Sequence, residues 1–252
     1  MFRVGNFRNL PYFCLKFYRK QDKILHRKNC SALKEVMNFP RQIMVSVEGN
    51  IGCGKTTLLN YFDQFDNVET MQEPIEQWIN VDGHNSLEQL YQDPSRWSFT
   101  FNSHALLTRV DLHTRPPTKT VRMLERSVFS TYHCFIRNNF LSKDLNGLEF
   151  AVLKKWFHWL IYKHNLGLDQ IVYLKADPHL CFERLKKRCR KEEDPVPVSL
   201  LENLHKIHEE WLIKQSYGPL PAPVKVIDTN LHLEKLFNVY EEEKSQILCQ
   251  AL

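Results

Sequence analysis

The sequence predicts an α/β domain in which helices cover both faces of a parallel sheet. The first sign is a series of short apolar runs rich in β-branched residues, which is typical of buried strands. The second sign is the helical stretches between those runs, which are long enough for crossovers between parallel strands. The 252 residues, 43% hydrophobic and 25% charged, provide ample core and exclude a disordered or fibrous chain.

The predicted strands lie at residues 43–47, 68–71, 121–124, 171–174 and 224–227. The first run stops at Gly49, as a buried strand followed by a turn would. Residues 56–62, directly after that turn, have helical character. This alternation along the chain is what predicts parallel rather than antiparallel pairing.

A long helix is predicted in the middle of the chain. It should begin at Pro94 or Ser95 and run to about His113, because Asp93 is a natural cap and no breaker follows before Pro116. Three of its side chains lie at i, i+3 and i+7 and should therefore share one face: Asn102, Ala105 and Arg109.

Two more helices are predicted near the C-terminal end. One should start at Asp177 and Pro178. The other should open with a capping box formed by Ser199 and Glu202, just after Pro197. The residues expected on its buried face are Leu200, Leu201, Leu204, Ile207, His208 and Trp211.

The charge is unevenly distributed. Residues 1–40 carry nine Lys and Arg residues against two acidic ones, a net +7, so the rest of a chain with formal charge +5 carries −2. We interpret residues 1–40 as a basic leader resembling a mitochondrial transit segment, with a cytoplasmic or nuclear location as the alternative, and residues 41–252 as one domain. The acidic balance of that domain argues against a nucleic-acid polymer as partner.

No apolar run is long enough to predict a membrane span. The seven cysteines show no paired spacing, which suits a reducing compartment.

Residues 49–56 fit the phosphate-binding pattern of a glycine, four residues, and then Gly-Lys-Thr. The glycines let backbone N–H groups converge on phosphate oxygens, Lys55 offsets their charge, and the Thr56 hydroxyl can ligate Mg²⁺. The strand before and the helix after the pattern disfavour a chance glycine turn. By itself the pattern predicts only a nucleoside triphosphate, held by Gly49, Asn50, Ile51, Gly52, Cys53, Gly54, Lys55, Thr56 and Thr57.

A carboxylate and an indole follow the second predicted strand. Glu73 stands at the carboxyl end of that strand, beside the phosphate loop, where a carboxylate can accept a proton from a hydroxyl that attacks the γ-phosphate. Trp78 would then wall the acceptor pocket. The alternative interpretation is a surface Glu-Pro turn with a core tryptophan.

A glutamate and an arginine follow the third predicted strand at the same edge of the sheet. Arg126 would hold the acceptor oxygen and stabilise the charge that is transferred, while Glu125 would act on the metal or its water shell. The alternative is a solvated ion pair that opens a helix.

A basic run extends from Arg184 to Glu193. A solvated helix face is the usual meaning of such a run. Here it leads into the loop residues Asp194-Pro195-Val196-Pro197, where a mobile lid would cover phosphates and exclude water.

Taken together, these segments resemble the deoxyribonucleoside kinase family over nearly all of residues 43–230, most closely the mitochondrial thymidine kinases and the multisubstrate insect enzymes. The strings that carry the resemblance are Val47-Glu48-Gly49-Asn50-Ile51, Gly54-Lys55-Thr56-Thr57, Glu73-Pro74 with Trp78, Tyr91 with Asp93, Ser95-Arg96-Trp97, Glu125-Arg126-Ser127, and the basic run followed by His208-Glu209-Glu210-Trp211-Leu212. The resemblance implies a phosphate-loop NTPase-like fold with a five-stranded parallel sheet and an arginine-rich lid, assembled as a homodimer. It also implies ATP-dependent phosphorylation of the 5′-hydroxyl of deoxyribonucleosides, with Mg²⁺, in nucleotide salvage.

The resemblance also implies a role for each matching residue. Glu73 would be the general base, and Arg126 would hold the 5′-oxygen beside Lys55. Thr56 and Glu125 would serve the metal. The 3′-hydroxyl would be bound by Tyr91 and Glu193. The base would be walled by Trp78, Phe101 and Phe135, and the lid arginines over ATP would be Arg184, Arg188 and Arg190.

The base pocket departs from the family pattern. Asn102 stands where the family carries Gln, so the amide keeps its donor and acceptor but is one methylene shorter. Arg109 and Ala105 resemble the deoxycytidine kinase branch, whereas Thr131 matches neither branch. Thymidine, deoxycytidine and the purine deoxynucleosides all remain open as substrates. A nucleoside monophosphate kinase and a catalytically weak nucleotide-binding sensor are the alternatives.

Overall fold

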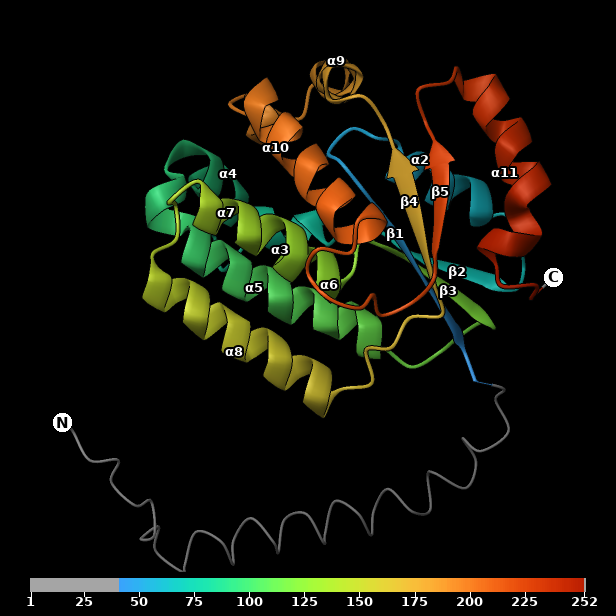
Figure 1. Cartoon of the computed structure of the whole chain (residues 1–252), viewed down its shortest axis with the longest axis horizontal. Coiled ribbons are helices and arrows are strands. Elements are labelled where there is room, and N and C mark those ends of the chain that lie inside the picture. Colours follow the sequence, from blue (N-terminus) through green and yellow to red (C-terminus); the bar gives the residue numbers. More distant parts are fainter. Residues whose placement is uncertain (1–40, 252) are drawn as a thin grey trace, which may run out of the picture. The chain divides into compact units, whose positions relative to one another are not determined.

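A five-stranded parallel sheet forms the centre of the protein in the computed structural model, which describes residues 41–251 (Figure 1). The strands are β1 (Ile43–Gly49), β2 (Val68–Met71), β3 (Val121–Glu125), β4 (Gln170–Lys175) and β5 (Val224–Asp228). Their order is β2-β3-β1-β4-β5, and every pairing is parallel. All five predicted strands are confirmed, to within two residues at their ends. The predicted leader, residues 1–40, lies outside the described residues.

The strand order brings the ends of three strands together. The chain passes from β1 out to the edge strand β2, returns to β3, and only then crosses to the other side of β1 to form β4 and β5. Residues that follow β1, β2 and β3 therefore meet at one edge of the sheet, because the carboxyl ends of parallel strands point the same way. The register pairs Val47 with Glu125 and Met71 with Leu124 at that edge.

Helices cover both faces of the sheet, which confirms the predicted fold class (Figure 1). On one side lie α2 (Lys55–Phe62) and α11 (Leu233–Ile247). Tyr61 of α2 contacts Phe237 and Tyr240 of α11 at ring-centroid distances of 5.7 and 5.5 Å. The opposite side carries α5 (Pro94–Thr114), α8 (Gly147–Lys163) and α10 (Val198–His208). The largest hydrophobic core is formed by the strands together with α2, α10 and α11.

The shorter elements line the open edge of the sheet or connect the long helices. They are α3 (Ile75–Ile79), α4 (Ser86–Gln92), α6 (Val128–Ser130), η1 (Thr131–Ile136), α7 (Arg137–Leu141), α9 (Pro178–Arg188), η2 (Lys191–Glu193) and η3 (Glu209–Ile213). Both η1 and η3 are π-helical, and they meet where His133 stacks on Trp211 with ring centroids 5.3 Å apart. The sequence patterns do not predict either π-helix.

The predicted helix starts were right in two cases and wrong in one. The Asp93 side chain accepts the Arg96 backbone N–H, and the Asp177 side chain accepts those of His179 and Leu180. The capping box predicted for α10 is wrong. This helix begins at Val198 with Pro197 as its cap and no side-chain cap, so Ser199 already lies inside the first turn.

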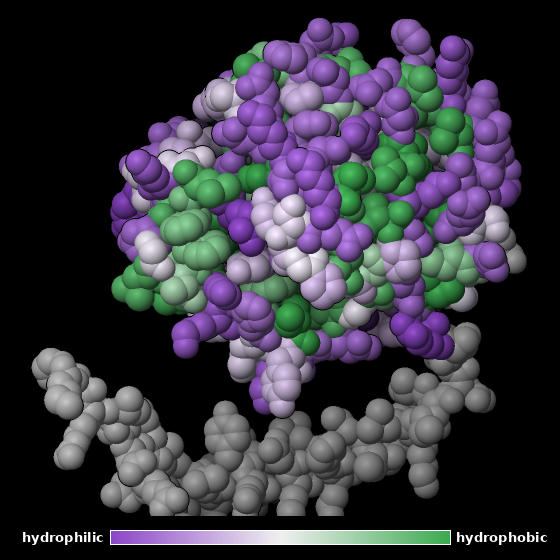
Figure 2. Space-filling model, viewed as in Figure 1, coloured by the Kyte–Doolittle hydropathy of each residue, from purple (hydrophilic) through white to green (hydrophobic). Residues whose placement is uncertain are grey.

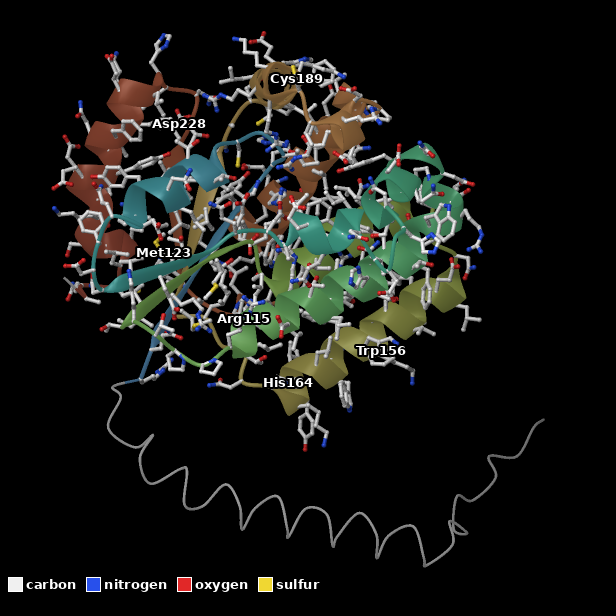
Figure 3. The ribbon with its side chains drawn as sticks, turned by 180° about the vertical axis from the view of Figure 1, so that it is seen from behind. Arg115, Met123, Trp156, His164, Cys189 and Asp228 are labelled. Atoms are coloured by element: carbon white, nitrogen blue, oxygen red, sulfur yellow. The ribbon has the colours of Figure 1, made fainter. Side chains whose placement is uncertain are left out.

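The surface carries an apolar region around α8. Figure 2 shows hydrophobic residues gathered over α7 and the start of α8, where Leu141 is 62% and Leu148 is 75% exposed. Farther along α8, Trp156 and Trp159 are half exposed, and Figure 3 shows Trp156 on the outer side of this helix. None of the helices described in the structure combines the length and apolarity needed to cross a bilayer.

Candidate active site

The phosphate loop connects β1 to α2 and depends on its glycines. Gly52 has a φ of 79°, and a Cβ there would lie 2.5 Å from the carbonyl oxygen of Cys181. Gly54 has a φ of 101° but open space around it. The loop therefore needs glycine at position 52 both for its backbone conformation and for its close approach to α9.

Two side chains hold the loop in shape. Lys55 is buried, and its Nζ donates to the Asn50 carbonyl at 2.9 Å. Asn50 donates from Nδ2 to the Leu201 carbonyl of α10 at 2.8 Å, and its Oδ1 accepts the Ile51 N–H at 2.9 Å. The loop is thus fixed against α10 before any phosphate binds, with the N-terminus of α2 behind it.

Thr56 and Glu125 are the residues that could hold a magnesium ion. The Thr56 hydroxyl lies 2.9 and 3.1 Å from the two Glu125 carboxylate oxygens, and Lys55 Nζ lies 4.0 Å from Glu125. Residues 41–251 contain no cluster of three or more His, Cys, Asp or Glu side chains arranged for a metal. One hydroxyl and one carboxylate nevertheless fit Mg²⁺, which keeps several waters and binds substrate phosphates rather than a full protein cage.

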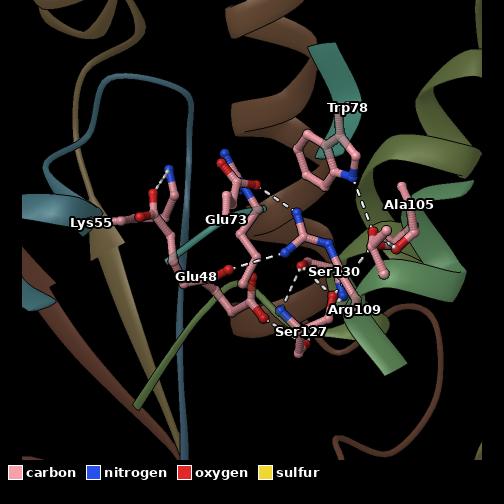
Figure 4. Close-up of polar contacts among 12 residues, drawn as sticks. Glu48, Lys55, Glu73, Trp78, Ala105, Arg109, Ser127 and Ser130 are labelled. Atoms are coloured by element: carbon pink, nitrogen blue, oxygen red, sulfur yellow. Dashed lines mark hydrogen bonds and ion pairs between the residues drawn. The ribbon is translucent and has the colours of Figure 1, made fainter. Parts of the chain in front are cut away.

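Glu73 lies between two buried arginines, as Figure 4 shows for Arg109. Its Oε1 is 2.5 Å from Arg109 Nη2 and 2.9 Å from Arg126 Nε. Burial by itself would raise the pKa of Glu73, but the guanidinium groups of Arg126 and Arg109 outweigh it and lower this pKa to about 2. Glu73 is therefore an ionised carboxylate at neutral pH, 17% exposed, rather than a surface turn residue.

Arg126 follows β3 in a strained conformation. Its φ is 64°, in the left-handed region that residues other than glycine rarely adopt. The backbone N–H donates to the Val47 carbonyl at 3.0 Å, and Nη1 donates to the Gly49 carbonyl at 2.5 Å. The guanidinium also lies 4.8 Å from the ring of Phe135. Strain of this kind concentrates at functional sites, and here it turns Arg126 back over the start of the phosphate loop.

A cavity of about 270 Å³ joins the phosphate loop to the space beyond Glu73. This volume is just below the ~300–1,000 Å³ found for small-molecule sites. Sixteen of the predicted site residues line it: Ile51, Gly52, Lys55, Glu73, Trp78, Tyr91, Phe101, Asn102, Ala105, Arg109, Glu125, Arg126, Thr131, Phe135, Arg188 and Glu193. Eight others do not line it: Gly49, Asn50, Cys53, Gly54, Thr56, Thr57, Arg184 and Arg190.

Aromatic and helical residues shape the cavity away from the phosphate loop. Asn102, Ala105 and Arg109 are all buried on one face of α5 and all line the cavity, as their spacing predicted. Trp78 contacts Phe101 edge-on at 5.4 Å, and its Nε1 donates to the Thr108 hydroxyl at 3.0 Å (Figure 4). Both rings are thereby fixed in orientation as flat apolar walls.

The third region of the site brings the basic run close to Tyr91. Burial, followed by the charge of Glu193, raises the pKa of the Tyr91 phenol, so its O–H stays intact as a donor. Glu193 is itself buried and forms ion pairs with Arg188 and, at 3.0 Å, with Arg190. Arg184 points elsewhere and donates to the Thr229 carbonyl beyond β5 at 2.9 Å.

Sequence reasoning missed several residues that the fold brings to this site. Asn138, Asn139, Ser142 and Asp144 line the cavity together with the predicted Thr131 and Phe135. Their spacing after Thr131 is close to the helical repeat, which is the signal that would have found the first three. Glu48 was also missed. It is fully buried behind the loop and accepts hydrogen bonds from the Ser46 and Ser127 hydroxyls (Figure 4).

Fold and site together define a phosphate-loop kinase with an acceptor cavity of about the size of a small molecule. Comparison with known proteins agrees. The family model described as "Deoxynucleoside kinase" matches residues 45–250. The chain is 42% identical over 208 residues to mitochondrial thymidine kinase 2 of Homo sapiens, covering 82% of this chain and 78% of that protein. It is 35% identical over 216 residues to deoxycytidine kinase 2 of Gallus gallus, covering 74% of this chain and 82% of that protein. It is 30% identical over 252 residues to deoxycytidine kinase of Homo sapiens, covering 88% of this chain and 97% of that protein.

The chain therefore belongs to the deoxynucleoside kinase family. It is accordingly an enzyme, a transferase of the deoxynucleoside kinase class. The relatives include both thymidine kinases and deoxycytidine kinases, so the comparisons leave the preferred base open.

Proposed function

We propose that this protein transfers the γ-phosphoryl group of ATP to the 5′-hydroxyl of deoxyribonucleosides. The observation that carries the proposal is the position of Glu73. This ionised carboxylate lies in the cavity that also contains Lys55 and Gly52 of the phosphate loop. A neutral hydroxyl bound beside Glu73 would be in line with a triphosphate held on the loop.

In the proposed step, Glu73 accepts the proton of the 5′-hydroxyl as the oxygen bonds to the γ-phosphorus. The bond between that phosphorus and the β–γ bridging oxygen breaks, and ADP leaves with the electron pair. A carboxylate with a pKa of about 2 is a weak base, so its main task is to orient the hydroxyl until proton transfer becomes favourable late in the step. Arg126 and Lys55 offset the negative charge on the transferring group.

Residues on either side of the reacting atoms would complete the site. Mg²⁺, held through Thr56 and Glu125 directly or by water, would neutralise charge on the β- and γ-phosphates. Backbone N–H groups of residues 49–57 would hold the triphosphate, and Arg184, Arg188 and Arg190 would cover it. For Arg184 this requires release from the Thr229 carbonyl, and for the other two it requires exchange of Glu193 for phosphate as ion-pair partner. Tyr91 and Glu193 would bind the 3′-hydroxyl of the sugar.

The charge balance of the cavity favours a nucleoside over a nucleoside monophosphate as acceptor. The cationic groups that line it are each close to a carboxylate: Arg109 and Arg126 to Glu73, Lys55 to Glu125, and Arg188 to Glu193. An acceptor phosphate beside Glu73 would place a second anion against this carboxylate, whose two arginines already pair with it, and two buried anions in contact repel each other. A hydroxyl brings no such charge.

Oligomeric state and location are part of the proposal. The exposed Leu107, Trp156, Trp159 and Tyr162 of α5 and α8, 64%, 51%, 49% and 83% exposed, support a homodimer that covers these helices. The basic residues 1–40 and the mitochondrial thymidine kinases among the relatives support a mitochondrial location. The net charge of −2 on the remainder supports a small-molecule partner rather than a nucleic-acid polymer.

The test is ATP-dependent phosphorylation of thymidine, deoxycytidine, deoxyadenosine and deoxyguanosine, each assayed alone with the full chain. We expect turnover of at least one deoxynucleoside and none of the corresponding monophosphates. Turnover of the monophosphates would identify a monophosphate kinase instead. ATP binding without phosphorylation of any acceptor would indicate a nucleotide-binding sensor. Light scattering on the same preparation measures whether the protein is a dimer.

A further inference from the structure

The base end of the cavity contains a chain of polar side chains that begins at Asn102. The Asn102 Nδ2 group donates to the Ser98 carbonyl at 2.8 Å and to Asn139 Oδ1 at 3.1 Å. Because the Ser98 carbonyl can only accept, the orientation of the Asn102 amide is fixed. Both of its N–H groups are used, so Asn102 can offer a bound base only its oxygen.

Asn139 continues the chain to Asp144. With its Oδ1 accepting from Asn102, Asn139 has its N–H groups left to donate, and its side chain interacts with the Asp144 carboxylate in the sense that lowers the pKa of that group. The backbone holds the same geometry, because the Asn139 carbonyl accepts the N–H groups of Asp144 and Leu145 at 2.8 and 3.0 Å. Burial raises the pKa of Asp144, and the hydrogen bond from Asn139 opposes that shift.

This chain lies at the far end of the cavity from the phosphate loop. Asn102 is seven residues before Arg109 on α5, which corresponds to about 10 Å along the helix axis. Arg109 contacts Glu73, and Asn102, Asn139 and Asp144 line the same cavity. A nucleoside with its 5′-hydroxyl at Glu73 therefore directs its base toward Asn139 and Asp144.

Three of the polar groups at this end present hydrogen-bond acceptors to a bound base. The Asn102 oxygen and the Asp144 carboxylate accept only, and the Thr131 hydroxyl donates to the Ser127 carbonyl with 3.4 Å between the two oxygens. Cytosine and adenine carry an exocyclic amine, a donor, at the corresponding position of the ring, whereas thymine and guanine carry a carbonyl oxygen. A carbonyl placed against these acceptors loses its hydrogen bonds to water without replacement.

We propose that Asp144, positioned by Asn139, accepts a hydrogen bond from the exocyclic amine of the base and selects deoxycytidine and deoxyadenosine over thymidine and deoxyguanosine. This inference rests on the proposed function, because it assigns the base specificity of the same site. Asp144 acts as a specificity residue, and Asn139 is a positioning residue that acts through it.

The experiment compares kcat/KM for the four deoxynucleosides in the wild type and in Asp144→Asn, Asp144→Leu and Asn139→Leu. In the wild type we expect kcat/KM for deoxycytidine to exceed that for thymidine by about tenfold or more. Asp144→Leu should remove most of that ratio, chiefly by raising KM for deoxycytidine, while thymidine is unaffected or improved. Asp144→Asn, which is isosteric, and Asn139→Leu should lower the ratio less. Asp66→Asn, an exposed aspartate outside the cavity, is the matched control.

A wild type that prefers thymidine or deoxyguanosine would overturn the inference, as would a deoxycytidine-to-thymidine ratio unchanged within twofold in Asp144→Leu. Calorimetric Kd values for the same nucleosides provide a second readout that does not depend on turnover. If no deoxynucleoside is phosphorylated, the proposed function fails. If all are phosphorylated and the ratios of kcat/KM do not change in the Asp144 variants, only the assignment of Asp144 fails.

Discussion

Two arginine–glutamate pairs connect the segments of β2 and β3, one near the start of the strands and one just beyond their carboxyl ends, and they differ in how completely they are satisfied. Glu69 in β2 pairs with Arg122 in β3, and four residues later along each segment Glu73 pairs with Arg126. Both arginines are almost fully buried. The local spacing is the same, so the difference between the pairs comes from what surrounds them.

The Arg122 pair is closed. Its guanidinium contacts Glu69 at 2.9 Å and donates to backbone carbonyls that include those of Arg115 and Pro116, both at 2.8 Å. Glu69 also accepts hydrogen bonds from Gln42 and from Thr118. Each charge is surrounded by partners, which is the condition under which a buried ion pair is tolerated. Nothing in this arrangement is left to bind a ligand.

The Glu73 pair is open. Arg126 Nε lies 2.9 Å from Glu73 but makes no well-directed hydrogen bond, and the buried Nε of Arg109 also has no partner among the described residues. The left-handed backbone at Arg126 adds strain, and all three side chains line the cavity. Buried donors without partners and stored strain indicate a site whose remaining partners belong to the substrate. A saturated pair therefore maintains the fold, while an unsaturated one beside a cavity is available for chemistry.

The largest expected effect is on turnover in Glu73→Gln. Loss of the proton acceptor should lower kcat by about 10²–10⁴-fold. The KM for the deoxynucleoside should change little, since glutamine still accepts a hydrogen bond. Steady-state kinetics measure both, with the exposed Glu76→Gln as control. A kcat near that of the wild type would show that Glu73 is not the base. It would also contradict the conclusion that the Glu73 pair, unlike the Glu69 pair, takes part in the reaction.

Arg122→Met should affect stability instead of turnover. It leaves the buried Glu69 without its cation, and breaking a buried pair from one side costs about 3–5 kcal/mol in the free energy of unfolding. Urea titration measures this loss, while kcat of the folded protein should stay near that of the wild type. The control is Arg115→Met, which removes a surface pair with Asp111 worth about 0–1 kcal/mol. Equal losses in the two variants would contradict a structural role for Arg122.

The smallest effect should be a shift in the pH profile of Arg109→Met. Removing a cation beside Glu73 raises the pKa of this carboxyl from its value of about 2, because burial then opposes the charge with less compensation. In the wild type, kcat/KM should show no loss from Glu73 protonation between about pH 5 and pH 8. In the variant the acidic limb should move to higher pH.

The control for that profile is Arg137→Met, because Arg137 stacks on Tyr217 at 3.7 Å rather than contacting Glu73. An acidic limb at the same pH in all three proteins would mean that Arg109 does not set the pKa of Glu73. The position of the limb is the readout, since the overall level of kcat/KM would also respond to the lost contacts of Arg109 with Glu73 and the Glu125 carbonyl.

Most of the fold could be predicted from local pattern. The five strands and the start of α5 at Asp93 follow from apolar runs and capping chemistry, both of which act over a few residues. The capping box at Ser199 failed because Pro197 supports an earlier start, with its carbonyl accepting the Leu200 N–H at 3.1 Å. Two start signals stood two residues apart, and sequence reasoning chose the wrong one.

The site residues also fall into two groups, those that a local motif predicts and those that only the fold brings together. The phosphate loop is contiguous, so its eight residues and their backbone requirements can be recognised without a fold. The base end combines α5 with η1, α7 and the loop after α7, and Asn139 and Asp144 carry no motif. Their meaning depends on contacts with Asn102, which is 37 residues from Asn139 in sequence.

The sequence by itself determined the parallel α/β architecture and the phosphate loop, because each depends on short patterns with a local physical cause, and the resemblance of its combined motifs to a known family indicated the class of reaction. Only the tertiary structure decided which buried arginine–glutamate pair is saturated, that Arg109 faces Glu73, and that acceptors gather at the base end. These are properties of hydrogen-bond partners supplied by distant segments. The residue type specifies which donors and acceptors a side chain has, while the fold specifies which of them already have hydrogen-bond partners.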